Sequence, residues 1–237
     1  MKKLIALCVA SLFLAPPLAA KDVLKYSTTV SGIPLGKVKV VVDTEPSAYR
    51  VRAGFSMIPL LRHIFNGDAE ADVTGTVAGG RFLPGESVFR YEGRKEDKRI
   101  AILFEAGVPV DLEADPPIRK TSYRMSLDEA AGAVDPATAA ALLMAPRERP
   151  CALTFDIFDG TKRHRISLTG QATATEGNTV TCVGLYERVN GFKAKYMTPE
   201  RRSWPFRATL MAANGRWVPL KITADTKFGP ASATLRR

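Results

Sequence analysis

The chain has 237 residues, of which 46% are hydrophobic and 24% are charged, with 18 glycines and 16 prolines. This composition excludes a fibrous or disordered protein and favours a globular one. Lysine and arginine total 34 against 24 acidic residues, so the formal net charge is +10 at pH 7. The length fits one large domain, and the basic surface serves either solubility or an anionic partner.

Residues 1–20 have the pattern of a cleaved secretory signal peptide. Two lysines precede an apolar run from Leu4 to Leu14, and small residues lead to a predicted cut after Ala20. The run is too short to cross about 30 Å of hydrocarbon, and Cys8, which lies inside it, is removed with it. We expect an exported domain of residues 21–237 without a transmembrane segment. Loss of two of the 34 basic residues leaves 32 against 24 acidic ones, a net charge of +8.

Two cysteines remain in the exported chain, Cys151 and Cys182. An oxidising compartment favours a disulfide between them, which would close a loop of about 30 residues. Redox and zinc-finger spacings are absent, so a structural role is favoured over a catalytic or metal-binding one. In simple hairpin order the two cysteines lie two strands apart, about 9 to 10 Å on a flat sheet. Either the sheet curls, or this pairing is wrong.

Most of the exported chain alternates between apolar and polar residues with a period of two, which predicts antiparallel strands. The first seven strands are expected to form a meander, at Leu24–Val30, Lys37–Asp43, Tyr49–Phe55, Ala69–Val77, Gly80–Tyr91, Asp97–Glu105 and Val108–Asp111. A polar stretch with prolines, Ala114–Met125, then interrupts the pattern.

Two segments have helical patterns instead. Met57–Phe65 carries apolar residues on one helical face, which predicts a short amphipathic helix. In the second segment Asp135 is a predicted N-cap, Pro136 suits the first helical position, and an alanine-rich run continues to Met144. The run from Ala137 to Ala145 has no charged residue, so we expect this helix to be buried on the concave side of a curved sheet.

The dipeptide Asp159-Gly160 predicts a hairpin with a two-residue turn. The resulting register places Asp156 opposite Arg163, Phe155 opposite His164 and Cys151 opposite Leu168. Because this pairing divides the run 162–165 between two faces and gives Arg163 a carboxylate, it disfavours an anion-binding patch there.

Two further turn dipeptides predict two more hairpins. Asn190-Gly191 is expected to join 180–189 to 192–197, and Asn214-Gly215 to join 206–211 to 217–224, before a last strand at 226–235. The expected fold is therefore mainly β: a single, strongly curved antiparallel sheet, an open or spiral β-barrel, with two short packed helices.

The sequence offers little support for catalysis. Neither His63 nor His164 lies next to a candidate nucleophile, and the nucleophile-elbow, phosphate-loop and dinucleotide patterns are absent. Two histidines without a carboxylate cluster make a poor metal site, so we expect no metal and no cofactor. The two carboxylates that a cell-wall glycan hydrolase needs would have to come from Glu105, Asp111, Glu113 and Asp115. The segment that carries them is more typical of a solvated loop.

Basic and aromatic residues are interleaved near the C-terminus. A surface for lipid head groups or glycans is favoured over a nucleic-acid stacking surface, because an exported protein seldom meets nucleic acid. A merely basic exterior is favoured still more. The residues concerned are Lys193, Lys195, Arg201, Arg202, Arg207, Arg216 and Lys221, with Phe192, Tyr196, Trp204, Phe206 and Trp217.

Several motifs together carry a family resemblance. They are the segments 31–37, 156–163, 186–192 and 226–229 and the pair Cys151 and Cys182. Over about Tyr26 to Leu235 the chain resembles the Gram-negative periplasmic family known as domain of unknown function three-one-zero-eight. The resemblance implies a periplasmic location but no catalytic residues. It also implies an architecture similar to that of envelope lipoprotein carriers, with a greasy concave face.

We therefore expect a non-enzymatic periplasmic protein of the cell envelope that binds a hydrophobic or amphipathic component, such as a lipid, a lipoprotein acyl chain or a peptide. The alternatives are an interaction or scaffold protein without a cavity and, less favoured, a glycan hydrolase. The candidate lining residues, for which core packing is the competing role, are Ile58, Leu61, Ile64, Phe65, Leu142, Leu143 and Met144.

Overall fold

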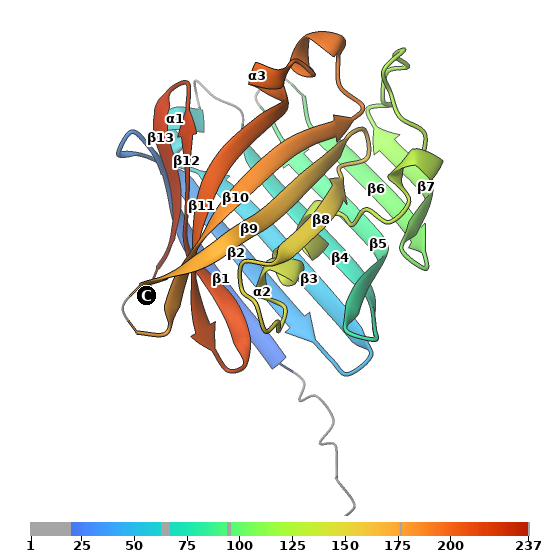
Figure 1. Ribbon diagram of the computed structural model, residues 1–237. Coiled ribbons are helices and arrows are strands. Elements are labelled where there is room, and N and C mark those ends of the chain that lie inside the picture. Colours follow the sequence, from blue (N-terminus) through green and yellow to red (C-terminus); the bar gives the residue numbers. More distant parts are fainter. Residues whose placement is uncertain (1–19, 63–66, 94–95, 176, 237) are drawn as a thin grey trace, which may run out of the picture.

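A single antiparallel sheet of 13 strands dominates the computed structural model, which describes residues 20–62, 67–93, 96–175 and 177–236 (Figure 1). The strand order is β7-β6-β5-β4-β3-β2-β1-β13-β12-β11-β10-β9-β8. Two meanders, β1 to β7 and β8 to β13, are thus joined where β1 pairs with β13. The sheet curls strongly but does not close, because β7 and β8 are its two edges. The predicted fold class is confirmed.

The strand bounds follow the predicted meander closely in the first half of the chain. These are β1 Ala20–Val30, β2 Ile33–Thr44, β3 Ala48–Met57, β4 Asp68–Ala78, β5 Arg81–Glu92, β6 Lys98–Glu105 and β7 Val108–Asp115. The second half comprises β8 Leu153–Phe158, β9 Arg163–Thr175, β10 Thr179–Asn190, β11 Ser203–Ala213, β12 Arg216–Thr226 and β13 Gly229–Leu235. The predicted signal peptide lies outside the described residues except for Ala20.

Three short α-helices interrupt the strands, where the sequence predicted two. They are α1 Pro59–Arg62, α2 Pro136–Met144 and α3 Pro199–Arg202, with two 3-10 turns, η1 Asp128–Ala130 and η2 Ala194–Tyr196. The end of the predicted first helix, including Ile64 and Phe65, lies outside the described residues. None of the helices in the described ranges is long and apolar enough to span a bilayer.

Helix α2 lies on the concave side of the sheet, as its lack of charge predicted (Figure 1). It contacts β3, β4 and β5 of one meander and β8 and β12 of the other. Its buried residues Ala137, Ala141 and Met144 pack against valines of the sheet, Val40, Val42, Val51 and Val73. The small alanines let the helix approach the sheet closely, so the helix forms the centre of the core.

Backbone groups at both ends of α2 that lack a partner within the helix form hydrogen bonds with side chains inside the protein. The buried carboxylate of Asp135 accepts hydrogen bonds from the backbone N–H groups of Ala137 (2.8 Å) and Thr138 (3.1 Å), as predicted for an N-cap. The hydroxyl groups of Thr138 and Tyr49 lie 2.7 Å apart, which ties this cap to β3. At the other end Arg147 donates to the carbonyl of Leu143 at 3.0 Å.

The segment between β7 and α2 fills the gap between the two sheet edges. Its residues Met125, Ala130 and Ala133 pack against Ile102 and Phe104 of β6 and Phe158 of β8. Val134 forms a parallel bridge with Ile157, in which the backbone N–H of Phe158 donates to the Val134 carbonyl at 2.8 Å. Side-chain packing therefore closes the gap that strand pairing leaves open.

The predicted register of the β8–β9 hairpin is wrong by two residues. Asp156 pairs with Arg165, and Phe158 pairs with Arg163, across a four-residue loop. The loop is longer because the Asp159 carboxylate accepts hydrogen bonds from the backbone N–H groups of Thr161 and Lys162, both at 2.8 Å. His164 accordingly lies opposite Ile157, and Cys151 lies outside the paired strands. A register shift of two residues leaves each side chain on the same face of the sheet. Asp156 therefore still forms an ion pair with Arg163, at 2.7 Å.

The predicted second hairpin is also wrong. The residues after Asn190-Gly191 do not form a strand; they form η2 and α3, and β10 pairs with β11 instead. Pro199 begins α3, where a missing backbone N–H costs nothing. The hairpin at Asn214-Gly215 is confirmed, with both residues at positive φ as its turn requires.

Cys151 and Cys182 form the predicted disulfide, with their Cα atoms 5.3 Å apart. Cys151 precedes β8 and lies on the concave side, and Cys182 lies in β10 at a register shift between Thr181 and Val183. Both cysteines are buried with Leu168 and Leu210. The separation expected for a flat sheet does not apply, because the turn before β8 folds over the sheet.

Replacing both cysteines with serine should lower the free energy of unfolding by about 3 kcal/mol, since the cross-link closes a loop of 31 residues and constrains the unfolded chain. Urea unfolding of the oxidised protein and the double variant measures this difference. Non-reducing peptide mapping should recover the linked pair, and free thiols at both positions in exported protein would contradict it.

Candidate ligand pocket

A pocket of about 850 Å³ lies at the end of the sheet where the β5–β6 and β8–β9 turns meet. One wall is the inner face of β5 and β6, and a second is the segment 114–124 after β7. The tip of the β8–β9 hairpin, with Gly191, forms a third side. The pocket is within the size range of small-molecule sites, about 300 to 1,000 Å³.

Two glycines allow the third side to approach the others. A Cβ atom on Gly160, whose φ is +91°, would lie 2.8 Å from a methyl group of Ile100. A Cβ atom on Gly191, at φ +86°, would lie 2.5 Å from the carbonyl oxygen of Thr161. A larger residue at position 160 would push the hairpin tip away from β6, and one at position 191 would push the tip away from the end of β10.

The lining of the pocket is amphipathic. Its apolar part consists of aromatic, aliphatic and proline residues, namely Phe89, Ile100, Ile102, Pro116, Pro117, Ile118 and Tyr123. Its charged part has five basic residues against three acidic ones: Lys98, Arg99, Arg119, Arg124 and Lys162 against Glu96, Asp115 and Asp159. A molecule with an apolar body and an anionic group matches both parts.

Arg119 and Arg124 form no ion pair with a carboxylate in the described part of the chain, and Lys162 forms no direct ion pair there but lies close enough to Asp159 for its charge to act on that carboxylate. The other two have exposed acidic neighbours, since Lys98 lies 3.2 Å from Glu96 and Arg99 lies 3.7 Å from Glu113. The pocket therefore has an excess of positive charge that internal ion pairs do not neutralise.

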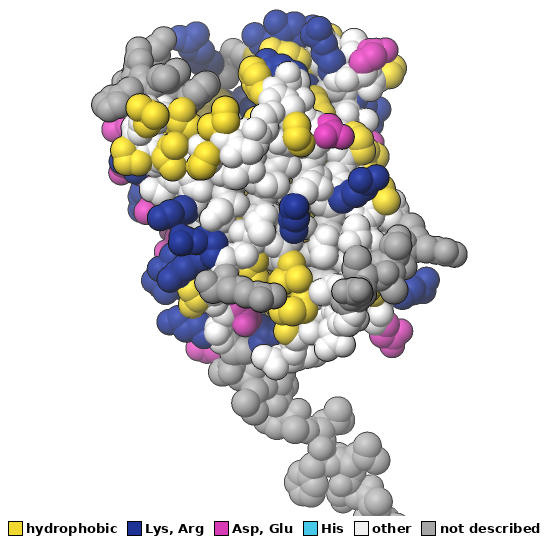
Figure 2. Space-filling view, turned by 90° about the vertical axis from the view of Figure 1, so that its left-hand side faces the viewer, with side chains coloured by type: hydrophobic (Ala, Val, Ile, Leu, Met, Phe, Trp, Pro, Cys, Tyr) yellow, Lys and Arg dark blue, Asp and Glu magenta, His cyan; other side chains and the backbone are white. Residues whose placement is uncertain are grey.

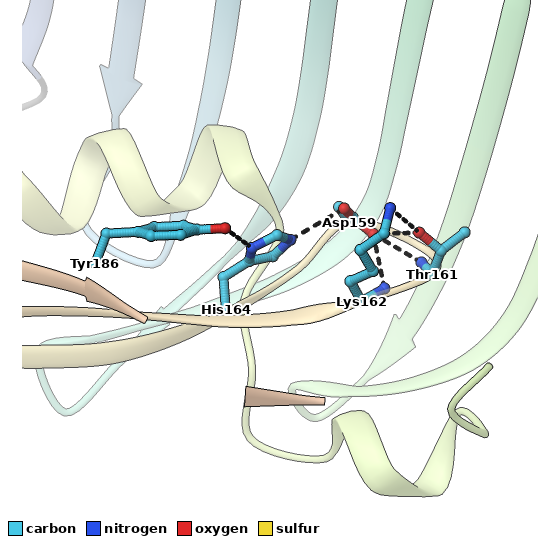
Figure 3. A network of polar contacts seen from close by, with 5 residues as sticks. All are labelled: Asp159, Thr161, Lys162, His164 and Tyr186. Atoms are coloured by element: carbon cyan, nitrogen blue, oxygen red, sulfur yellow. Dashed lines mark hydrogen bonds and ion pairs between the residues drawn. The ribbon is translucent and has the colours of Figure 1, made fainter. Parts of the chain in front are cut away.

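A polar network fixes the hairpin tip (Figure 3). The Asp159 carboxylate accepts from the Thr161 hydroxyl at 2.8 Å and from His164 Nε2 at 3.0 Å. The other ring nitrogen of His164, Nδ1, lies 2.5 Å from the Tyr186 hydroxyl oxygen. Since an ionised carboxylate only accepts, His164 donates from Nε2 to Asp159, and in the tautomer with its proton on Nε2 the Tyr186 hydroxyl donates to Nδ1. Both ring nitrogens are engaged, so this network braces the tip rather than activating a nucleophile.

The carboxyl of Asp159 is held in its charged form. Burial by itself would raise its pKa, but the hydrogen bond from His164, the charge of Lys162 and the hydrogen bond from Thr161 outweigh burial and lower the pKa to about 2. Burial raises the pKa of Tyr186, which keeps its hydroxyl proton for the bond to His164. Across the neutral pH range the Asp159 carboxyl is therefore charged and the Tyr186 hydroxyl keeps its proton.

An aromatic cage next to this network accounts for part of the interleaved pattern near the C-terminus. The guanidinium carbon of Arg188 lies 4.4 Å from the ring centre of Trp204, 5.0 Å from that of Tyr196 and 5.1 Å from that of Phe192. Arg188 also donates to the carbonyl of Arg201 at 2.9 Å. These contacts hold the segment between β10 and β11 in place, so the cage is occupied by the protein's own arginine.

A family model matches residues 25–236, nearly the whole described chain. The chain belongs to the family described as Protein of unknown function (DUF3108). No curated protein and no solved structure shows a significant match. Membership confirms the family resemblance and assigns no reaction, so the chemistry of this DUF3108 member has to be argued from its own residues.

The predicted lining residues that the structure describes do not line this pocket, and Ile64 and Phe65 lie outside the described residues. Met144 is buried in the central core, Leu143 packs near the disulfide, and Leu142 is partly buried. Ile58 and Leu61 lie at α1 and are partly buried there. None of these five residues belongs to the lining.

The four acidic residues considered for glycan cleavage are all exposed, and only Asp115 belongs to the pocket lining. Glu105, Asp111 and Glu113 point away from it on the solvent side of β6 and β7, so no paired-carboxylate cleft forms from this set. In the described ranges no group of three or more His, Cys, Asp and Glu residues is arranged to hold a metal ion.

No sequence pattern predicted this set of pocket residues, and Lys162 belongs to the run 162–165, for which the predicted pairing disfavoured an anion-binding patch. Lys98, Arg119, Arg124 and Lys162 come from three separate segments, and no spacing rule connects them. The available signal is the proline-bearing stretch 114–125, which interrupts the strand pattern and combines basic, apolar and aromatic residues.

The Asp159→Asn variant should lower the free energy of unfolding at pH 7 by about 1–2 kcal/mol, because it weakens charged hydrogen bonds at the tip. The folded-state pKa lies below the usual 3.8, so the stabilisation is present above about pH 4 and is lost as the pH falls towards 2. Urea unfolding over this range should show the two proteins converging at low pH.

The matched control is Glu105→Gln, which changes an exposed carboxylate with no described partner and should leave stability unchanged. An equal effect of both variants, or a difference between wild type and Asp159→Asn that persists at pH 2, would contradict the assigned role of Asp159.

Proposed function

We propose that this protein is a non-enzymatic periplasmic protein of the cell envelope that binds an anionic amphipathic component, such as a lipid or a lipoprotein acyl chain. The observation that carries the proposal is the pocket lining, where an apolar wall meets two arginines, Arg119 and Arg124, that have no carboxylate partner among the described residues. The predicted signal peptide and the disulfide fit an exported location.

The apolar part and the basic part of the lining would contact different parts of the ligand. Phe89, Ile100 and Ile102 on the sheet and the prolines after β7 remove apolar surface of the ligand from water. Arg119 and Arg124 on the opposite segment, with Lys162 at the hairpin tip, supply charge to the anionic end. No proton transfer or covalent step is required of the protein, so its role is to hold the ligand and release it unchanged.

Native mass spectrometry of protein purified gently from the periplasm, followed by organic extraction, tests this function. The expected result is a stoichiometric lipid or acyl species that is recovered chemically unchanged. An empty protein that gains no mass when envelope lipids are offered would overturn the proposal and favour the interaction or scaffold role. Conversion of the bound species would overturn the non-enzymatic part.

The double variant Arg119→Gln, Arg124→Gln should weaken binding of an anionic single-chain lipid, such as lysophosphatidylglycerol, by about tenfold or more at low salt. Binding of an uncharged monoacylglycerol should change little, because the apolar wall is intact. Arg207→Gln, an exposed arginine on β11 outside the pocket, is the control. Equal losses for both lipids, or a loss in the control, would contradict head-group recognition by these arginines. Isothermal calorimetry measures all three proteins.

A further inference from the structure

Three turns converge at one end of the sheet, on the side opposite the pocket-lining strands β6 and β7. They are the β1–β2 turn, the segment around α1 and the β12–β13 turn. Ser31 donates from its side chain to the carbonyl of Phe228 at 2.8 Å, and from its backbone to the carbonyl of Pro230 at 2.8 Å. The backbone N–H of Ile58 donates to the carbonyl of Leu35 at 2.9 Å. These bonds hold the three turns together as one rim.

The rim presents the most exposed large hydrophobic side chains of the described residues. Leu60 is 73% exposed, Phe228 is 70% exposed and Ile33 is 61% exposed. Each belongs to a different turn, and Figure 2, which looks at this side of the molecule, shows hydrophobic side chains gathered near its upper end. Apolar side chains on converging turns cost free energy in water unless a partner covers them.

The charge of the rim identifies the chemistry of that partner. The three segments 30–37, 56–62 and 225–231 contain the basic residues Lys37, Arg62 and Lys227 and one acidic residue, the exposed Asp225, which pairs with Pro230 beside the β12–β13 turn. Arg62 is paired with Asp68 of β4, whereas Lys37 and Lys227 form no ion pair with a described residue. Lys227 Nζ lies 4.7 Å from the centre of the Phe228 ring, so a cation and an apolar side chain point out of the same turn.

We propose that this rim docks on the surface of an anionic lipid bilayer. Side chains on separate turns can each enter the interface between head groups and acyl chains, while the adjacent lysines interact with lipid phosphates. A rim of three turn tips fits a soft, laterally mobile surface better than a rigid protein groove.

The strand topology places the rim and the pocket at the same end of the molecule. In an antiparallel meander successive turns alternate between the two ends, and the β1–β2, β5–β6, β8–β9 and β12–β13 turns all lie at the same end. The rim and the pocket therefore share one end of the molecule, and docking directs the pocket towards the membrane. The docking inference itself rests on the rim alone and does not require the pocket to bind a ligand.

Co-sedimentation of the exported chain with vesicles tests the inference. Binding is expected with vesicles of phosphatidylglycerol and phosphatidylethanolamine, should weaken as salt is raised, and should be absent with phosphatidylcholine vesicles. Equal binding to both compositions, or no binding to either, would overturn the inference.

The triple variant Ile33→Ser, Leu60→Ser, Phe228→Ser should reduce vesicle binding by more than tenfold. The matched control is Val23→Ser, Leu103→Ser, Val183→Ser, which changes three exposed apolar side chains on β1, β6 and β10 and should bind as the wild type does. Thermal unfolding of both variants checks that the fold is retained. Unchanged binding of the rim variant, or equal losses in both variants, would overturn the inference.

Two further measurements separate this inference from its competitors. The rim variant should still gain the mass of lysophosphatidylglycerol offered below its micelle concentration, so loss of docking is distinguishable from loss of the proposed ligand binding. Size-exclusion chromatography over a range of concentrations should show no self-association that the rim substitutions abolish. Such self-association would assign the rim to an interface between two copies instead.

Discussion

The burial of helix α2 against the curved sheet is the constraint on which the rest of the structure depends. The helix contacts strands of both meanders, so it sets the distance between them and the curvature of the sheet. A helix can be buried there only if the unpaired backbone N–H and C=O groups at its two ends find hydrogen-bond partners inside the protein. Asp135 is the partner at one end: burial raises the pKa of its carboxyl, and the donors of Ala137 and Thr138 oppose that shift. At the other end Arg147 donates to carbonyls of the last turn.

The edge strands β7 and β8 do not pair, and the segment between β7 and α2 occupies the gap. One half of that segment, with Met125 and Ala133, completes the core. The other half, 114–124, forms a wall of the pocket. The open sheet edge and the pocket thus have the same physical origin, since a sheet closed by strand pairing would leave no place for this segment.

Some lysines and arginines of the described chain form ion pairs with carboxylates, and others do not. Asp156 forms ion pairs with Arg163 and Arg165. Asp159 accepts hydrogen bonds from the backbone of its own loop and from His164. Among the cations in no described ion pair are Arg119 and Arg124 in the pocket and Lys37 and Lys227 on the rim, and the pocket and the rim lie at the same end of the molecule. This placement connects the two proposals: an anionic amphiphile and an anionic membrane surface present the same chemistry, and a protein that moves one has reason to dock on the other.

Much of the fold could be predicted from the sequence alone, because period-two alternation, the Asp135-Pro136 helix start and the Asn214-Gly215 turn act through local backbone preferences. Local preference failed at two hairpins. The side chain of Asp159 organised a longer loop, and the residues after Gly191 packed against Arg188 instead of pairing. The pocket was decided only by tertiary structure, since its cations lie far apart in the sequence. The curvature that α2 imposes on the sheet brings them together, and no sequence spacing encodes it.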